Sequence, residues 1–334
     1  MEPLGGTTLV SFAIGASSAV ACAALLISCP ELPARRALPG AEPHTVVQPV
    51  ARPQVALVLS GGSLRGFAHL GVLKVLAANG IHPDLIVGTS AGSIVGGLYA
   101  SGMSVAAMEE AAAGIDFDLF AGFLASRFGI GRPLVHSFVE QFTRGARIET
   151  FPTRFAAVAT DLQRGCVAVF NGGDAAVAIQ ASTAVPGVFA PTSIGERDYV
   201  DGGLVSPLPV RVARALGAER VIAIDVVFDP NESRLSSTID RLFQTTLVMT
   251  RALANQEGRE ADVLIAPTLP PQAEVTLANH RALIAAGERA AMVALPRIHA
   301  LLASERVVPL KVFAGRGELD WCRTVRPLQT ARAR

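Results

Sequence analysis

Charged side chains are scarce in this sequence. Lys, Arg, Asp and Glu make up 17% of its 334 residues, whereas they make up roughly 25% of an average soluble domain. The two signs nearly cancel, with a net charge of +1 at pH 7, and the chain has neither a basic stripe nor an acidic tail. Because nucleic acid binding depends on clustered positive charge, the composition argues against a nucleic acid partner.

Cysteine is also scarce. The four cysteines, at positions 22, 29, 166 and 322, form no CxxC pair and show no spacing typical of a metal site. The glycine-rich block "GGSLRG", residues 61–66, lacks the GK[ST] ending of a Walker loop, and Ser63 stands where a dinucleotide-binding loop needs glycine. We therefore expect no metal, no cofactor and no nucleotide.

Charge is absent altogether from Leu4 to Cys29. An apolar stretch of this length is typical of an export signal or a membrane anchor. Its end, "LISC", resembles the lipobox of bacterial lipoproteins, which predicts lipidation at Cys29. Export signals usually start with positive charge, whereas this segment has Glu2 and no Lys or Arg before it. An uncleaved transmembrane helix, a misassigned start and a buried helix are the alternatives.

A proline-rich segment separates this stretch from the rest of the chain. Residues 30–53 hold six prolines and show no apolar periodicity, which is typical of an extended linker. At about 3.1 Å per residue, such a linker reaches on the order of 70 Å. We expect a membrane-attached lipoprotein that faces the periplasm or the cell exterior, with a single-helix membrane anchor as the alternative.

Regular structure is predicted from residue 55 onward. The segments "VALVLS" and "DLIVG" are apolar runs typical of buried parallel strands, and a helical pattern follows each of them. More strands are predicted at "FAAVATD", "CVAVF", "YVD", "RVIAIDVV" and "ADVLIAPTL", and more helices at "AAVAIQASTA", "PLPVRVARALG" and, as one or two helices, residues 279–303. This alternation predicts an α/β fold with a mainly parallel central sheet flanked by helices.

Phenylalanine is concentrated in one segment of the chain. Eight of the fifteen phenylalanines lie between residues 117 and 155. An ordinary helical core would explain this concentration. The functional alternative is an apolar cap over a ligand pocket, where acyl chains would bind.

One serine stands between two glycines where a predicted strand gives way to a predicted helix. The sequence "GTSAG", residues 88–92, has the Gly-x-Ser-x-Gly pattern of a nucleophile elbow. A helix that begins at this serine would direct free amides and the positive end of its dipole toward an anion formed there. Ser90 is therefore the candidate nucleophile, and a plain tight turn is the alternative. Ser93, one turn further on, is expected on the helix surface.

A glycine-rich loop, "SGGSLRG" at residues 60–66, also joins a predicted strand to a predicted helix. The backbone amides of Gly61, Gly62 and Ser63 are candidates for an oxyanion hole. Arg65 falls in the first turn of the following helix, where a cation is electrostatically unfavourable. We expect Arg65 to hold the loop or to meet an anionic group, and a solvated surface position is the alternative.

The general base is harder to find. Only His280 and His299 follow the plausible aspartates, and both lie in helical patterns, so a Ser-His-Asp triad is poorly supported. His69 is expected to be packed inside the helix after the glycine-rich loop. Asp201, in "YVDGG", ends a short predicted strand and is the better candidate, although an aspartate before two glycines can also be a turn residue.

Together these blocks resemble the patatin-like phospholipase family of serine acyl hydrolases. The resemblance extends over roughly residues 54–300 and rests on "GGSLRG", "GTSAG", "VATDLQRG" and "ASTAVPGVFAPTSIGERDYVDGGLVSPLPV", in the family's order. It implies a three-layer α/β/α fold, with Ser90 as nucleophile and Asp201 as its dyad partner and proton acceptor. The implied oxyanion hole consists of Gly61, Gly62, Ser63 and Arg65. Ser63 departs from the family, which has a third glycine there, and a positive φ at this residue would be costly.

The resemblance also implies a function. We expect a serine acyl hydrolase of phospholipase or lysophospholipase type, with a lipid ester as substrate and a membrane surface as partner. A catalytically silent lipid-binding or scaffolding protein of the same fold and a general carboxylesterase are the alternatives. The expected organisation is a signal peptide or anchor at 1–29, a linker at 30–53, the hydrolase domain at 54–300 and a C-terminal extension at 301–334. The sequence does not identify a protein partner.

Overall fold

Five consecutive apolar residues form the strand β1 (Val55–Leu59), and all five are buried at the centre of the sheet. The structure is a computed structural model that describes residues 55–113, 132–230, 238–269 and 277–304. The predictions for residues 1–29 with Cys29, for the linker 30–53 and for most of the extension 301–334 lie outside the described residues. Among the described helices, none combines the length and the apolar character needed to cross a bilayer.

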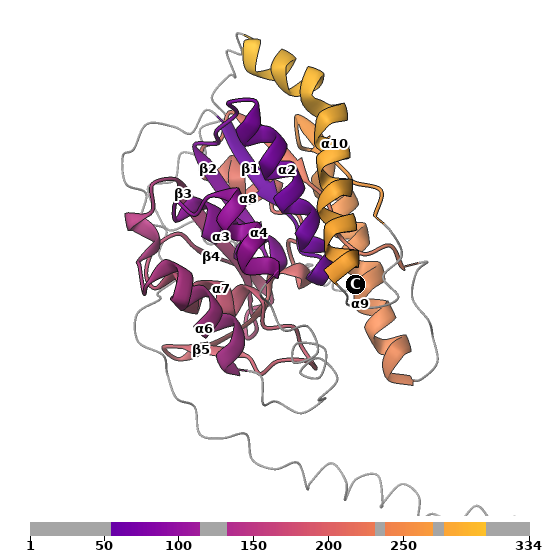
Figure 1. Ribbon diagram of the computed structural model, residues 1–334. Coiled ribbons are helices and arrows are strands. Elements are labelled where there is room, and N and C mark those ends of the chain that lie inside the picture. The colour runs from indigo at the N-terminus through magenta and orange to yellow at the C-terminus, as the bar shows by residue number, and fades with distance from the viewer. Residues whose placement is uncertain (1–54, 114–131, 231–237, 270–276, 305–334) are drawn as a thin grey trace, which may run out of the picture. The chain divides into compact units, whose positions relative to one another are not determined.

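The sheet is mixed, and its centre is parallel (Figure 1). The strand order is β5-β6-β3-β2-β1-β7-β8, and β4 also pairs with β3. The central strands β3, β2, β1, β7 and β8 are parallel, whereas β4, β5 and β6 form the antiparallel pairs. The other strands are β2 (Leu85–Thr89), β3 (Arg154–Asp161), β4 (Cys166–Phe170), β5 (Thr192–Ile194), β6 (Arg197–Asp201), β7 (Arg220–Ile224) and β8 (Val263–Ile265). The predicted mainly parallel sheet is therefore confirmed.

Helices cover both faces of this sheet. They are α2 (Phe67–Ala78), α3 (Ala91–Ala100), α4 (Val105–Ala113), α6 (Arg132–Thr143), α7 (Ala175–Ser182), α8 (Val210–Ala215), α9 (Thr238–Gly258) and α10 (Leu277–Ala303), with 3₁₀ turns η1 (Ser63–Gly66), η2 (Ile148–Thr150) and η3 (Gly202–Leu204). Leu57 and Leu59 pack in one core with residues of α2, α7 and α10. Ala56 and Val58 pack in a second core with residues of α8 and α9. Alternate side chains of β1 thus point to opposite faces, which gives the three-layer α/β/α fold.

Most of the predicted elements are present, but some were missed. The segment 279–303 forms one helix, α10, which continues through Pro296. Gly80, which follows α2, has φ of +67°, the left-handed conformation that glycine favours after the end of a helix. The sequence did not predict α4, α9 or β5, whereas α6 lies in the phenylalanine-rich segment, for which a helical core was one of the two interpretations.

The phenylalanines between residues 117 and 155 pack into the core where the structure describes them. Phe155 is buried, and Phe138 and Phe151 pack against the same core cluster. The rings of Phe138 and Phe142 lie 5.0 Å apart between centroids, in an edge-to-face arrangement. For these four residues the ordinary core is the right interpretation. The other four, at 117, 120, 123 and 128, lie outside the described residues, and so does that part of the predicted cap.

Two glycines let α2 and α10 lie with their backbones in contact. A Cβ atom on Gly71 of α2 would lie 1.9 Å from the carbonyl oxygen of Ile284. A Cβ atom on Gly287 of α10 would lie 2.0 Å from the carbonyl oxygen of Ala68. Because both obstacles are backbone atoms, neither can be relieved by a change of rotamer. The close crossing of these two helices therefore requires glycine at both positions.

Gly71→Ala should lower the free energy of unfolding by about 3 kcal/mol, since the added methyl group must separate two packed helices. Gly172→Ala is the matched control, because a Cβ there meets only the side-chain oxygen of Glu149 at 3.5 Å. Denaturant unfolding of both variants measures the difference. Equal stability of the two variants would show that α10 can shift away from α2 at little cost.

Candidate active site

Two strands end next to each other on one side of β3. β4 occupies the other side of β3. On the shared side, β2 pairs with the first half of β3 and ends with Thr89 opposite Val158. β6 runs in the opposite direction along the last three residues of β3 and ends with Asp201 opposite Ala159. The ends of β2 and β6 therefore meet, and the residue after Thr89, Ser90, lies beside Asp201.

Ser90 occupies the sharp turn between β2 and α3. Its backbone has φ of 53° and ψ of −123°, a conformation that is costly for any residue with a side chain. A Cβ atom on Gly92 would lie 2.3 Å from the carbonyl oxygen of Leu59, and one on Gly88 would lie 2.4 Å from the carbonyl oxygen of Gly92. The strand-turn-helix geometry predicted for "GTSAG" is present, and the spacing of its glycines follows from these close approaches.

The side chains of Ser90 and Asp201 are hydrogen-bonded to each other. The Ser90 hydroxyl donates to Oδ2 of Asp201 at 2.5 Å, and Oδ1 of Asp201 accepts the amide N–H of Gly203 at 2.7 Å. Asp201 is buried, and this burial raises the pKa of its carboxyl group to about 6, against the opposing effect of the two hydrogen bonds. Asp201 thus caps the turn η3 and also accepts a hydrogen bond from Ser90, and its role as general base stays a prediction.

Buried hydroxyl groups hold the backbone on both sides of this pair. The hydroxyl of Ser182 accepts the N–H of Ser90 at 2.9 Å and donates to the carbonyl oxygen of Val158 at 2.6 Å. The hydroxyl of Ser93 donates to the carbonyl oxygen of Ser90 at 2.6 Å. The prediction of Ser93 on the helix surface is wrong, because its side chain is buried against the elbow.

The glycine-rich loop follows β1, the neighbour of β2, so it lies at the same edge of the sheet as Ser90. The amide of Gly61 donates to the carbonyl oxygen of Pro207 at 3.0 Å. This bond corrects the expectation that Gly61 contributes to an oxyanion hole, and it leaves the amides of Gly62 and Ser63 as the candidate donors. Ser63 has φ of 50°. A positive φ is costly for serine, whereas glycine adopts it readily.

Arg65 is buried behind the loop. Its guanidinium group donates to the carbonyl oxygen of Val227 at 3.2 Å and lies 4.5 Å from the ring centroid of Phe228. The prediction that Arg65 holds the loop agrees with these contacts. The solvated surface position is wrong, because Arg65 is 3% exposed, and its role in the oxyanion hole stays a prediction.

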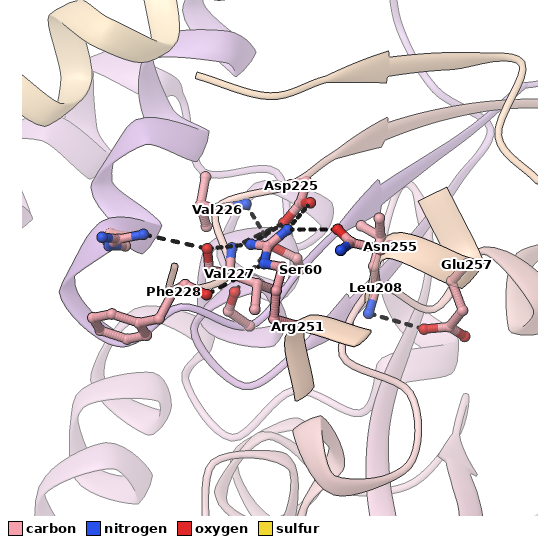
Figure 2. A network of polar contacts seen from close by, with 11 residues as sticks. Ser60, Leu208, Asp225, Val226, Val227, Phe228, Arg251, Asn255 and Glu257 are labelled. Atoms are coloured by element: carbon pink, nitrogen blue, oxygen red, sulfur yellow. Dashed lines mark hydrogen bonds and ion pairs between the residues drawn. The ribbon is translucent and has the colours of Figure 1, made fainter. Parts of the chain in front are cut away.

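The segment after β7 is in turn fixed by a buried ion pair. Figure 2 shows Arg251 of α9 between Asp225 and the carbonyl groups of Val227 and Phe228. Nη1 of Arg251 lies 2.6 Å from Oδ2 of Asp225. A Cβ on Gly62 would lie 2.6 Å from the carbonyl oxygen of Val226, so this segment packs directly against the backbone of the glycine-rich loop.

Among the described residues, no histidine hydrogen-bonds to Ser90 or Asp201; His280 stacks on the ring of Phe67 with 4.3 Å between centroids, and His299 is exposed. His69 is fully buried, as expected, and its Nε2 lies 3.0 Å from the carbonyl oxygen of Ser60. Burial lowers the pKa of His69 to about 4, so the neutral ring donates this hydrogen bond.

Several residues of the site went unnoticed in the sequence. These are Ser182, Ser206, Asp225, Arg251 and Glu257. Only Asp225, an acidic residue inside the predicted strand "RVIAIDVV", carried a local signal, because polar residues near the carboxyl ends of parallel strands often lie near binding sites. Within the described residues, no three His, Cys, Asp or Glu side chains lie close enough together to hold a metal ion.

Proteins similar to this chain were found in sequence and in structure. An uncharacterized NTE family protein of Mycobacterium tuberculosis is 34% identical over 187 residues, which cover 52% of this chain and 49% of that protein. Lysophospholipase NTE1 of Mycosarcoma maydis is 32% identical over 228 residues, which cover 65% of this chain and 12% of that protein. The crystal structure of VipD from Legionella pneumophila aligns with a TM-score of 0.48 and 14% identity over 74% of this chain and 67% of VipD.

This chain spans about half or less of the length of these curated relatives. The family model that matches it describes patatin-like phospholipases and covers residues 57–214. That range begins within β1 and ends within α8, so it includes the elbow, the glycine-rich loop and the strand that ends at Asp201. Residues 57–214 of this chain therefore match the patatin-like phospholipase family.

Proposed function

We propose that this protein is a serine acyl hydrolase that cleaves lipid ester bonds, of phospholipase or lysophospholipase type. The observation that carries the proposal is the 2.5 Å hydrogen bond from the Ser90 hydroxyl to Asp201, formed at a strained elbow within a patatin-like domain. The relatives named lysophospholipase NTE1 favour this substrate class.

In the first step, the oxygen of Ser90 attacks the ester carbonyl carbon while Asp201 accepts the hydroxyl proton. The developing oxyanion is stabilised by the amides of Gly62 and Ser63, and each such donor is worth about 3 kcal/mol in enzymes of this type. When the tetrahedral intermediate collapses, the bond to the alcohol breaks and Asp201 returns the proton to the leaving alkoxide. Ser90 then carries the acyl group as an ester.

In the second step, water attacks the acyl group on Ser90. Asp201 accepts a proton from this water, and the same two amides stabilise the second tetrahedral intermediate. Collapse of this intermediate breaks the bond to Ser90, which regains its proton from Asp201, and a fatty acid is released. One carboxylate thus serves as base and acid in both steps.

Two other functions differ from this proposal in testable ways. A catalytically silent lipid-binding protein would keep the fold without an activated serine, and the Ser90–Asp201 hydrogen bond argues against it. A general carboxylesterase would use the same chemistry on small soluble esters. Comparison of a phospholipid, a lysophospholipid and a short-chain ester as substrates separates the carboxylesterase from the lipid hydrolase.

Ser90→Ala should abolish ester hydrolysis and labelling by a fluorophosphonate, since the probe loses fluoride only to an activated serine oxygen. Thermal unfolding should change little, because only a hydroxyl at a partly exposed turn is removed. Ser101→Ala, at the other end of α3, is the matched control and should keep both signals. Labelling of the Ser90→Ala variant would place the nucleophile elsewhere.

The wild-type value of kcat/KM should fall as the pH drops through about 6, because Asp201 accepts the proton only when it is ionised and its pKa is raised to about 6. Asp201→Asn should lose about 10²–10⁴-fold in kcat and should lack this acid limb. The raised pKa means that the folded state disfavours the ionised carboxyl group of Asp201. The contribution of this group to the free energy of unfolding therefore decreases as the pH rises from 3.8 to about 6. The unfolding temperature of Asp201→Asn at pH 8 should therefore be no lower than that of wild type. A lower unfolding temperature would mean that Asp201 is a turn residue alone.

We also propose that the protein is exported and attached to a membrane through lipidation at Cys29. The uncharged segment and its "LISC" end are the main support. A tethered hydrolase would meet lipid esters at the bilayer that carries it.

Cells that express the wild type should incorporate a fatty-acid analogue into the protein, whereas the Cys29→Ala variant should remain unlabelled and keep the mass of its precursor. Wild type that is unlabelled and carries its first residues would contradict both the lipidation and the export.

A further inference from the structure

A buried carboxylate outside the dyad lies near the end of α9. Glu257 is only 4% exposed. Its Oε1 accepts the hydroxyl of Ser206 at 2.6 Å, and its Oε2 accepts the amide of Leu208 at 3.1 Å. Burial raises the pKa of this carboxyl group to about 7, although both hydrogen bonds oppose that shift. Burial of a carboxyl group costs free energy unless its contacts offset the loss of water. The contacts of Glu257 therefore indicate what its burial contributes to the structure.

The segment that Glu257 holds, residues 206–208, contacts both parts of the proposed catalytic machinery. The carbonyl oxygen of Ser206 accepts the hydroxyl of Thr89 at 2.8 Å. The carbonyl oxygen of Pro207 accepts the amide of Gly61 at 3.0 Å. Thr89 directly precedes the nucleophile, and Gly61 directly precedes the oxyanion donors. One short segment therefore sets the position of the elbow relative to the glycine-rich loop.

The same helix fixes the other side of the glycine-rich loop. Arg251 of α9 binds Asp225 and two carbonyl groups of the segment after β7, as Figure 2 shows together with the contact between Glu257 and Leu208. α9 thus binds the segments on both sides of the glycine-rich loop, which carries the proposed oxyanion donors. Only the Glu257 contact also connects to the elbow.

We propose that Glu257 is a positioning residue for ester hydrolysis, which fixes the distance between the oxygen of Ser90 and the amides of Gly62 and Ser63 by anchoring residues 206–208. The proposal rests on the proposed function, since it requires that these groups carry out the reaction. Misplacement of reacting groups by about 1 Å costs on the order of 100-fold in rate.

Ionisation of Glu257 changes this anchor. The carboxylate has an acceptor oxygen for each of its two partners, Ser206 and Leu208, whereas protonation converts one oxygen into a donor and weakens one of the two bonds. Arg211 of α8 favours the ionised form, and Glu260, just after α9, favours the neutral form. Because the pKa of Glu257 is raised to about 7, its hydrogen bonds to residues 206–208 weaken as the pH falls through about 7. This pH lies above the one near 6 at which protonation of Asp201 lowers kcat/KM.

The test uses Glu257→Gln, which keeps the shape of the side chain and replaces one acceptor oxygen by a donor, and Ser206→Ala, which removes one of the two hydrogen bonds. Glu288→Gln, a partly exposed carboxylate paired with Lys74 in a different part of the fold, is the matched control. The full-length protein is assayed with a short-chain p-nitrophenyl ester from pH 5 to 9. Fluorophosphonate labelling rates and thermal unfolding are measured in parallel.

Glu257→Gln should lower kcat by about 100-fold and change KM by less than twofold, and the labelling rate should fall in parallel. Its pH profile should lose the limb near 7 and keep the one near 6. Ser206→Ala should show a smaller loss in kcat, and it decides the question if Glu257→Gln does not fold. The control variant should match wild type in every measurement.

Wild-type kcat and an unchanged pH profile in the folded variants would overturn the positioning role and would make Glu257 a structural group alone. A parallel loss of thermal stability and activity, with the limb near 7 retained, would do the same. A wild type that neither hydrolyses esters nor reacts with the probe would overturn the proposed function itself, and this inference with it. The outcome for wild type therefore separates the two failures.

Discussion

The proposed chemistry depends on the meeting of two strand ends on one side of β3. Thr89 pairs with Val158 and Asp201 with Ala159, the next residue of the same strand. Since successive strand residues point to opposite faces, a slip of β6 by one residue would turn Asp201 away from Ser90. Pairing to a shared, buried strand therefore sets the 2.5 Å contact more rigidly than a flexible loop would.

The site concentrates features that cost stability. Ser90 and Ser63 have positive φ, and the carboxyl groups of Asp201 and Glu257 are buried with raised pKa values. Such features persist only where the surrounding structure over-determines them, and they are typical of functional sites. Here the surrounding structure consists of two apolar cores and a set of buried hydroxyl groups, of which Ser182 and Ser93 hold the backbone of Ser90 from both directions.

The helix α9 inverts the usual amphipathic arrangement. Its apolar Val248 and Met249 are 48% and 58% exposed, whereas its charged Glu257 is 4% exposed. Its inward-facing Arg251 binds the segment after β7, and its Glu257 binds residues 206–208 after β6. No side-chain pattern in these two segments indicates the contact with α9. Helices are predicted from an apolar face that is turned toward the core. The inward contacts of α9 are made partly by charged groups, and residues 238–258 were not predicted as a helix from the sequence.

The sequence by itself determined the features that depend on neighbours along the chain. Apolar runs predicted the central strands, and the glycines around Ser90 and the Asp-Gly-Gly block at Asp201 predicted two sharp turns at strand ends, because a tight turn restricts residue types locally. The tertiary structure alone decided that Ser90 and Asp201, 111 residues apart, share a hydrogen bond. It also directed the amide of Gly61 to Pro207, turned Arg65 toward Val227 and buried Ser93. These contacts join segments that are remote in sequence. Packing of the two cores brings the segments together, and no pattern within one segment indicates which remote segment it will contact.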